Sequence, residues 1–135
     1  MNGLPSGLVS LRDHETQASR TLDANALAYF TGGAADEITL HENQQAWQRR
    51  RLAPRVLQPL AGGHTRVPLL GRTLAHPILI APMAHQRLAH PHGERATALA
   101  AAAQGAGLVL STQASTPLED VARLVLGEIH RGPLW

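Results

Sequence analysis

The residues best suited to chemistry in this sequence follow a short aliphatic run. Ile78-Leu79-Ile80 leads directly into Ala81-Pro82-Met83-Ala84, and an alanine-rich segment comes next along the chain. This order predicts a buried β-strand, a loop and a helix, as in a parallel βα unit. Ligands bind at the carboxyl ends of the strands in such units, which places a candidate site at residues 81–84. A plain strand-to-helix turn is the alternative interpretation of the same residues.

Three histidines on the same loop raise the question of a metal site. His85, His90 and His92 have only one carboxylate nearby, that of Glu94, and their spacing fits no standard metal-ligand motif. We therefore expect no metal. The sequence contains no cysteine, which excludes disulfides and thiol nucleophiles, and no lysine, which excludes Schiff-base chemistry.

The elements around the candidate site predict an α/β fold. A strand at 78–81 is followed by a helix over about 92–104, a second strand at 108–110 and a helix that runs to about 126. Thr116-Pro117-Leu118-Glu119 has the spacing of a capping box at the start of that last helix. Leu134-Trp135 resembles the beginning of a third strand. The predicted order is therefore β-α-β-α-(β).

The first half of the chain is predicted to be helical and then extended. Residues 1–20 form a loose lead-in with a short helix, and Asp23 caps a helix through Phe30. A further helix fits Asp36 to about Arg51, with acids in its first turn, arginines in its last, and Leu40 and Trp47 on one face. Short strands or extended segments follow at Val56-Leu57 and from Arg66 to Gly71. We divide the chain into this lead-in (1–20) and one domain (21–135).

Composition limits the possible partners. The net charge is only +2, and the basic residues are dispersed arginines without interleaved aromatics, so we expect no nucleic-acid binding. The run Arg49-Arg50-Arg51 is interpreted as a solvated helix end. No run approaches the roughly 20 apolar residues that span a bilayer, and no secretory signal is recognised, so the sequence predicts a cytoplasmic protein.

Four segments, in order and at natural spacings, resemble the FMN-dependent α-hydroxy-acid dehydrogenases and oxidases, the family of glycolate oxidase, lactate oxidase and mandelate dehydrogenase. The resemblance covers about Leu22 to Trp135. The segments are residues 29–40 (YFTGGAADEITL), 51–55 (RLAPR), 77–84 (PILIAPMA) with 89–94 (AHPHGE), and 110–115 (LSTQAS).

The resemblance implies a (β/α)8 barrel with FMN at the carboxyl ends of its strands. Because such barrels need about 250 residues, this chain corresponds to the N-terminal part, an incomplete barrel of about two βα units after a helical segment. Pro82, Met83 and Ala84 match the loop against the flavin ring, and Ser111 matches a contact to the pyrimidine edge of the flavin. Relatives often carry a hydroxyl residue at position 83 and an aromatic at position 113, where this chain has Met83 and Gln113.

Tyr29 matches the family's tyrosine that binds the substrate carboxylate; the alternative is an amphipathic core tyrosine beside Phe30. The family's flavin-polarising lysine, histidine base and substrate-binding arginines come from later strands and have no counterpart here. The resemblance therefore implies the N-terminal segment of an FMN-dependent oxidoreductase that converts small 2-hydroxy acids to 2-oxo acids, inactive alone. A non-catalytic remnant or interaction module of the same fold is the alternative. With two strands left open, we expect self-association or a completing partner chain.

Overall fold

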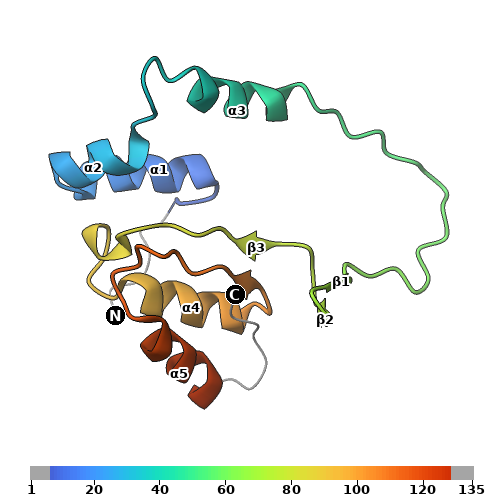
Figure 1. Cartoon of the computed structure of the whole chain (residues 1–135). Helices are drawn as coiled ribbons and strands as arrows, with labels where there is room; N and C mark the ends of the chain where they lie inside the picture. The colour runs from blue at the N-terminus through green and yellow to red at the C-terminus, as the bar shows by residue number, and fades with distance from the viewer. Residues whose placement is uncertain (1–6, 129–135) are drawn as a thin grey trace. The chain divides into compact units, whose positions relative to one another are not determined.

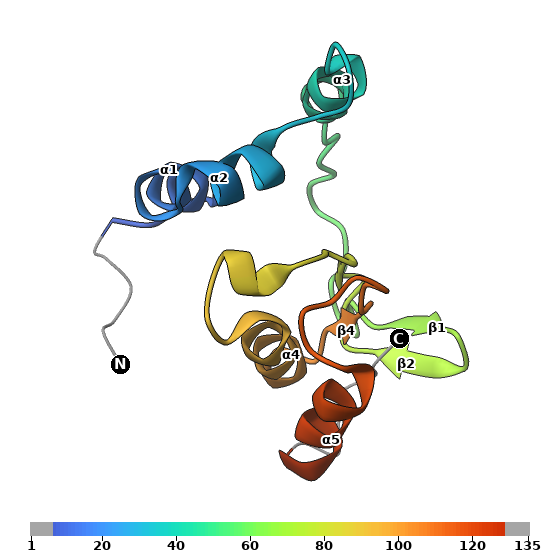
Figure 2. The same ribbon diagram turned by 60° about the vertical axis from the view of Figure 1, so that its left-hand side comes forward.

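The computed structural model describes residues 7–128, so the third strand expected at Leu134-Trp135 lies outside the described residues. The chain forms two compact units, Met1–Gln58 and Pro59–Trp135, which are described separately below. Figures 1 and 2 together label their α-helices and strands.

The described part of the first unit, residues 7–58, contains three helices. Helix α1 (Leu11–Thr21) begins with a capping box between Ser10 and Asp13, and α2 (Ala24–Thr31) begins with Asp23, whose carboxylate accepts the N–H groups of Asn25 and Ala26. The predicted cap at Asp23 is thus confirmed. Helix α3 (Ile38–Gln48) is shorter than predicted at both ends.

The start of α3 is set by a backbone turn that the sequence pattern does not show. Glu37 has a left-handed backbone (φ +57°), and its side chain accepts the Gly33 N–H at 2.9 Å. The acids expected in the first turn and the arginines expected in the last turn therefore lie outside the helix, and the predicted match to the helix dipole is wrong. Trp47, expected on an apolar face with Leu40, is 81% exposed.

The second unit opens with a hairpin. Strands β1 (Val67–Leu69) and β2 (Arg72–Leu74) pair antiparallel, with Val67 opposite Leu74. Leu70 and Gly71 both have positive φ, as a tight two-residue turn requires. Strand β1 confirms the extended structure predicted after Arg66, but the predicted segment ends early, because Leu70 and Gly71 form the turn. The predicted segment at Val56-Leu57 forms a bend.

A parallel βαβα arrangement follows the hairpin. Strand β3 (Leu79–Ile80) pairs in parallel with β4 (Gly107–Leu108), and α4 (Gly93–Ala103) connects them. The short 3-10 helix η1 (Gln86–Leu88) lies before α4, and α5 (Leu118–Glu128) follows β4. The predicted parallel pairing is confirmed, with both strands shorter than expected and α5 beginning after Pro117. The helix–strand order is visible along the yellow-to-red half of Figure 1.

Small side chains allow α4 to pack closely on this strand pair. The buried cluster joins three alanines of α4, the alanine just before β4, one residue of β4 and two valines of α5: Ala98, Ala101, Ala102, Ala106, Leu108, Val121 and Val125. Ile80 and Leu110 pack against its edge. Figure 2 shows α4 and α5 side by side, in agreement with their contacts. With no aromatic residue in this cluster, its stability depends on close aliphatic packing.

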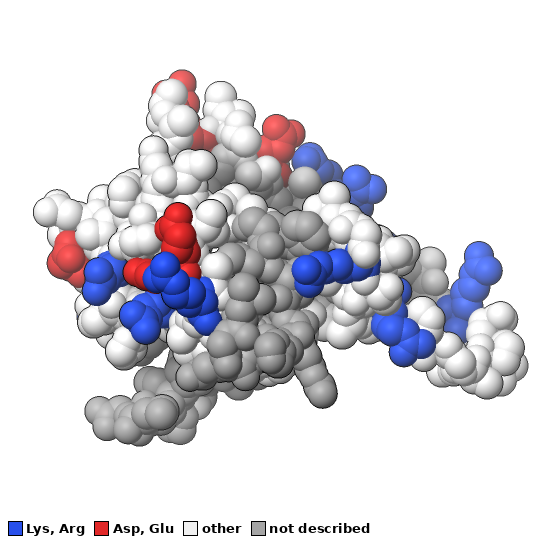
Figure 3. Space-filling view, turned by 60° about the horizontal axis from the view of Figure 1, so that its bottom comes forward, with Lys and Arg blue, Asp and Glu red and all other residues white. Residues whose placement is uncertain are grey.

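Charged side chains are interspersed on the surface of the described residues. On the face drawn in Figure 3, basic side chains lie singly or beside acidic ones. One such pair joins Arg123 to Asp120 at 2.9 Å. Among residues 7–128, no helix has the length and apolar character needed to cross a membrane.

Candidate functional site

The predicted site residues of the second unit lie at one end of the parallel strand pair. Ile80 is opposite Leu108, and Met83 and Ser111 each follow three residues later, in the loops after the two strands. The loops are joined just beyond this point, where the His85 N–H donates to the Gln113 carbonyl oxygen at 3.1 Å. The carboxyl ends of β3 and β4 therefore bring together two segments that are far apart in the sequence.

The loop after β3 presents main-chain donors. In the described part of the chain, no protein acceptor is found for the N–H groups of Met83 and Ala84, and the Met83 residue is 45% exposed. Unpaired N–H groups in an exposed loop can donate to a bound ligand. This is the feature expected of residues 82–84, whose small or flexible side chains leave the backbone accessible.

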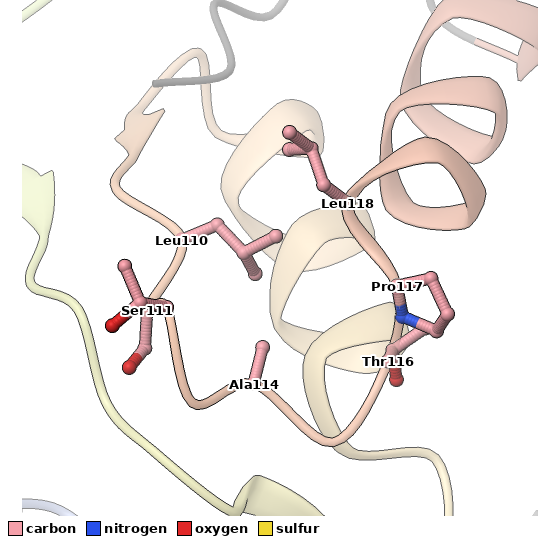
Figure 4. Close-up of a pocket in the computed structure, with 7 residues that line it drawn as sticks. Leu110, Ser111, Ala114, Thr116, Pro117 and Leu118 are labelled. Carbon is pink, nitrogen blue, oxygen red and sulfur yellow. The ribbon is translucent and has the colours of Figure 1, made fainter.

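Ser111 has a loop contact as well as a favourable position. Its hydroxyl oxygen accepts the Gln113 N–H at 3.1 Å, which is the local role that serine often plays in loops. This bond does not use the hydroxyl proton, which remains a donor. In Figure 4 Ser111 lies on the opposite side of the chain from Leu110. A hollow of about 300 Å³ is bordered by Leu110, Ser111, Ala114 and Leu118.

A buried carboxylate holds the two loops together. Glu94, in the first turn of α4, is 0% exposed. Its Oε1 atom accepts the Ser115 N–H at 2.8 Å and the Gln86 N–H at 3.3 Å, and its Oε2 atom accepts the Thr116 hydroxyl at 2.8 Å. The carboxylate thus connects η1, α4 and the loop after β4.

The charge of Glu94 is stabilised by hydrogen bonds. Burial acts to raise the pKa of its carboxyl group, but the donors outweigh this effect and lower the pKa below its ordinary value: the N–H groups of Ser115, Glu94 itself and Gln86, and the Thr116 hydroxyl. Its place in the first turn of α4 adds a favourable helix dipole. The ion pairs found among the described residues join Arg49 to Glu42 and Arg123 to Asp120, and neither involves Glu94.

Gln86 extends this network to the predicted site. Its side-chain amide donates to the Met83 carbonyl oxygen at 3.4 Å and accepts the Thr97 hydroxyl at 2.6 Å, and the residue is only 6% exposed. Glu94 and Gln86 therefore hold the loop that carries Met83 through hydrogen bonds to its backbone. The sequence interpretation missed both residues. The available signal was a glutamate placed directly after a glycine, at the start of an otherwise alanine-rich helix.

Gly93 permits the close approach that this network needs. Its φ is +43°, and a Cβ atom at this position would lie 2.7 Å from Arg87 Cγ and 3.2 Å from the Arg87 nitrogen. That nitrogen donates to the Ser115 hydroxyl oxygen at 3.2 Å, a further bond between the loops. The Gly93-Glu94 pair thus combines a close backbone contact with a buried acceptor.

The other predicted site residue is Tyr29. Tyr29 lies on α2 in the first unit, makes an edge-to-face contact with Phe30 (ring centroids 5.2 Å apart) and is 49% exposed, which is not a core environment. Its binding of a substrate carboxylate stays a prediction. His90 and His92 contact each other, and within residues 7–128 no three potential ligands converge on a metal position.

Comparison with known proteins identifies the family. A family model described as FMN-dependent dehydrogenase matches residues 18–135, which is most of the chain. The chain belongs to this family. Residues 82–84 and Ser111 lie within the matched region, as do Gln86 and Glu94.

Curated relatives and solved structures agree with this assignment. The chain is similar to an L-lactate oxidase from Roseobacter sp. (52% identity over 121 residues, 89% of this chain and 33% of the relative) and to a peroxisomal (S)-2-hydroxy-acid oxidase from Oryza sativa subsp. indica (45%, 84% and 31%). It also resembles a crystal structure of mandelate oxidase (TM-score 0.84, 35% identity, 93% of this chain and 36% of that one). The chain therefore spans about a third of the length of its FMN-dependent relatives, and the described unit is a part of their barrel fold.

The donor set at the strand ends fits one side of a flavin. Flavin rings carry nitrogen and carbonyl oxygen acceptors, and proteins tune them by hydrogen bonds. The Met83 and Ala84 N–H groups and the Ser111 hydroxyl proton are donors of the required kind. A mandelate oxidase variant with a C4a-OH-FMN adduct matches this chain with a TM-score of 0.79. The residues present are thus compatible with FMN.

Proposed function

We propose that this chain provides the first two βα units of an FMN-dependent oxidoreductase that converts small 2-hydroxy acids to 2-oxo acids. The observation that carries the proposal is that Met83, Ala84 and Ser111 all lie in the loops that follow the carboxyl ends of two parallel strands, and that a hydrogen bond from His85 to Gln113 joins these loops. Ligands of parallel βα barrels bind at this end. The names of the relatives, lactate and 2-hydroxy-acid oxidases, support the substrate class.

Each residue has a defined task in this function. FMN, when bound, accepts the two electrons that the hydroxy acid loses. The N–H groups of Met83 and Ala84 donate to the flavin ring and orient it, and the Ser111 hydroxyl donates to its pyrimidine edge. Tyr29 donates its phenolic O–H to the substrate carboxylate. No residue of this chain is assigned the role of base, so we propose that the chain alone does not turn over substrate.

Open apolar surfaces beside the strand pair support the need for further barrel units. One hollow lies between the end of β4 and α5, bordered by Leu110 and Leu118 (Figure 4). A second, of about 500 Å³, lies between β3 and α4 and includes Ile78 and Ile80. In a closed barrel every strand has two neighbours and every helix packs on adjacent units, so both surfaces would be covered.

A chimeric enzyme tests the proposal. Residues 18–135 would replace the matching third of the Roseobacter L-lactate oxidase, and the purified chimera would be assayed for flavin absorbance and L-lactate oxidation. We expect a yellow, active protein, and lower flavin affinity in the matched Ser111→Ala variant. The isolated chain is expected to bind FMN weakly or not at all, because the phosphate site of such barrels follows late strands.

A well-folded chimera that lacks flavin would contradict the flavin-contact role of residues 82–84 and Ser111. That result would favour the alternative, a non-catalytic remnant or interaction module. The remainder of the lactate oxidase, expressed without any first third, is the control that shows whether the flavin in the chimera depends on this chain.

A further inference from the structure

Glu94 is unusual because its carboxylate is buried away from any surface at which a ligand could bind. It is 0% exposed, so it cannot touch a flavin or a substrate. A buried carboxylate without a cationic partner is costly unless several donors satisfy it. Besides its own N–H, three donors from two separate loops do so: Gln86 N–H, Ser115 N–H and the Thr116 hydroxyl. Because the buried carboxylate needs these hydrogen bonds, it joins the two loops that supply the donors.

We propose that Glu94 is a positioning residue that holds the loop after β3 and the loop after β4 in one arrangement, so that the Met83 and Ala84 N–H groups and the Ser111 hydroxyl are presented together. This inference rests on the flavin-contact role proposed above. The loops involved, residues 81–92 and 109–117, carry the donors on one side and the partners of Glu94 on the other.

Two links transmit the position of Glu94 to the flavin side. The first runs through Gln86, whose backbone N–H is bound by Glu94 and whose side chain donates to the Met83 carbonyl oxygen. The second runs through Ser115, whose N–H is bound by Glu94 and which is four residues from Ser111. Next to both links, the His85 N–H donates to the Gln113 carbonyl oxygen, a bond that Glu94 does not touch. That bond reports whether the loops stay together.

The choice of a carboxylate follows from the number of donors. Glutamate offers two acceptor oxygens and no donor, which suits two N–H groups on Oε1 and one O–H group on Oε2. A glutamine could retain both N–H bonds through its oxygen, provided that the Thr116 hydroxyl turns to accept from the amide. Glu94→Gln thus preserves the connection without the charge, whereas Glu94→Ala removes the acceptor for all three donors.

Residue-resolved hydrogen exchange on the full chain tests the inference. In Glu94→Ala we expect the exchange of the His85 amide to rise at least about tenfold relative to that of Val109, whose N–H donates to Ile80 within the strand pair. Glu94→Gln is expected to restore His85 to within about threefold of wild type. Glu15→Ala, which changes an exposed glutamate of α1, is the matched control and should leave both amides unchanged.

Two outcomes would overturn the inference. If His85 and Val109 lose protection equally in Glu94→Ala, the carboxylate serves only global stability. If exchange rises at Gln86 and Ser115 but not at His85, the carboxylate satisfies its own donors without holding the loops together. None of these measurements involves flavin. If the exchange experiment fails, the flavin-contact role is still tested by the chimera. If the chimera lacks flavin, the exchange result for Glu94 still stands.

Discussion

Replacing Gly93 by alanine tests the close contact between η1 and the start of α4. The left-handed backbone at φ +43° costs a non-glycine residue about 1–2 kcal/mol. In addition, the new Cβ atom would lie 2.7 Å from Arg87 Cγ and 3.2 Å from the Arg87 nitrogen, so η1 must move by a few tenths of an ångström. That movement weakens the bond from Arg87 N–H to Ser115, worth about 1 kcal/mol. We expect a total loss of about 2–3 kcal/mol.

Gly105→Ala is the matched control for this prediction. Gly105 also has a positive φ (+67°), but its added Cβ atom would meet only Ala75 Cβ at 3.4 Å, an ordinary contact. We expect this variant to lose about 1–2 kcal/mol, the backbone cost alone. Native-state hydrogen exchange of the buried amides at Ala98 and Ala102 measures both losses, because a tenfold rise corresponds to about 1.4 kcal/mol. Equal losses in the two variants would refute the close contact at Gly93.

Three further predictions concern charge, core and surface. Because folding lowers the pKa of Glu94, its carboxylate stabilises the fold at pH values above the unfolded pKa of about 4.3. This stabilisation is lost as the pH falls through the lower pKa of the folded state. The difference in unfolding free energy between wild type and Glu94→Gln, measured by urea titration, should therefore shrink over that pH range. Val121→Ala should cost about 2–3 kcal/mol, since Val121 is 0% exposed, whereas Leu118→Ala at a 53% exposed position should cost under about 0.5 kcal/mol in the same titration. Finally, the isolated chain should self-associate and bind a hydrophobic dye, and Ile78→Glu at the open side of β3 should reduce both; a monodisperse wild-type monomer in sedimentation would contradict this.

Local signals explain the parts of the fold that the sequence predicts well. The Asp23 cap and the strand-loop-helix order after Ile78 depend on residues that are close together in the chain. The parallel pairing of β3 and β4 follows from the βαβ order, since a helical crossover returns the chain to begin the second strand in the same direction. Because parallel strands end at the same edge, the sequence also predicts residues 82–84 and Ser111 at one end of the pair.

Long-range contacts explain what the sequence does not predict. The role of Glu94 depends on hydrogen bonds from Ser115 and Thr116, which are 21 and 22 residues away in the chain. These residues come close to Glu94 only when the strand pair has formed. The start of α3 is set by the left-handed Glu37, a conformation that residue type alone does not favour. Helix periodicity groups Leu40 with Trp47, but it does not specify what covers that face, and Trp47 is exposed.

The hydrogen bonds of Glu94 also constrain the order in which this part of the chain can fold. Helix α4 brings Glu94 into position, but two of its three partners belong to the loop that follows β4. Until residues 115 and 116 have been synthesised and placed, the carboxylate must remain hydrated and the start of α4 must stay open to water. The first βα unit is therefore not an independent folding step. It closes together with the second, and the smallest segment that can complete this connection reaches from β3 to the start of α5.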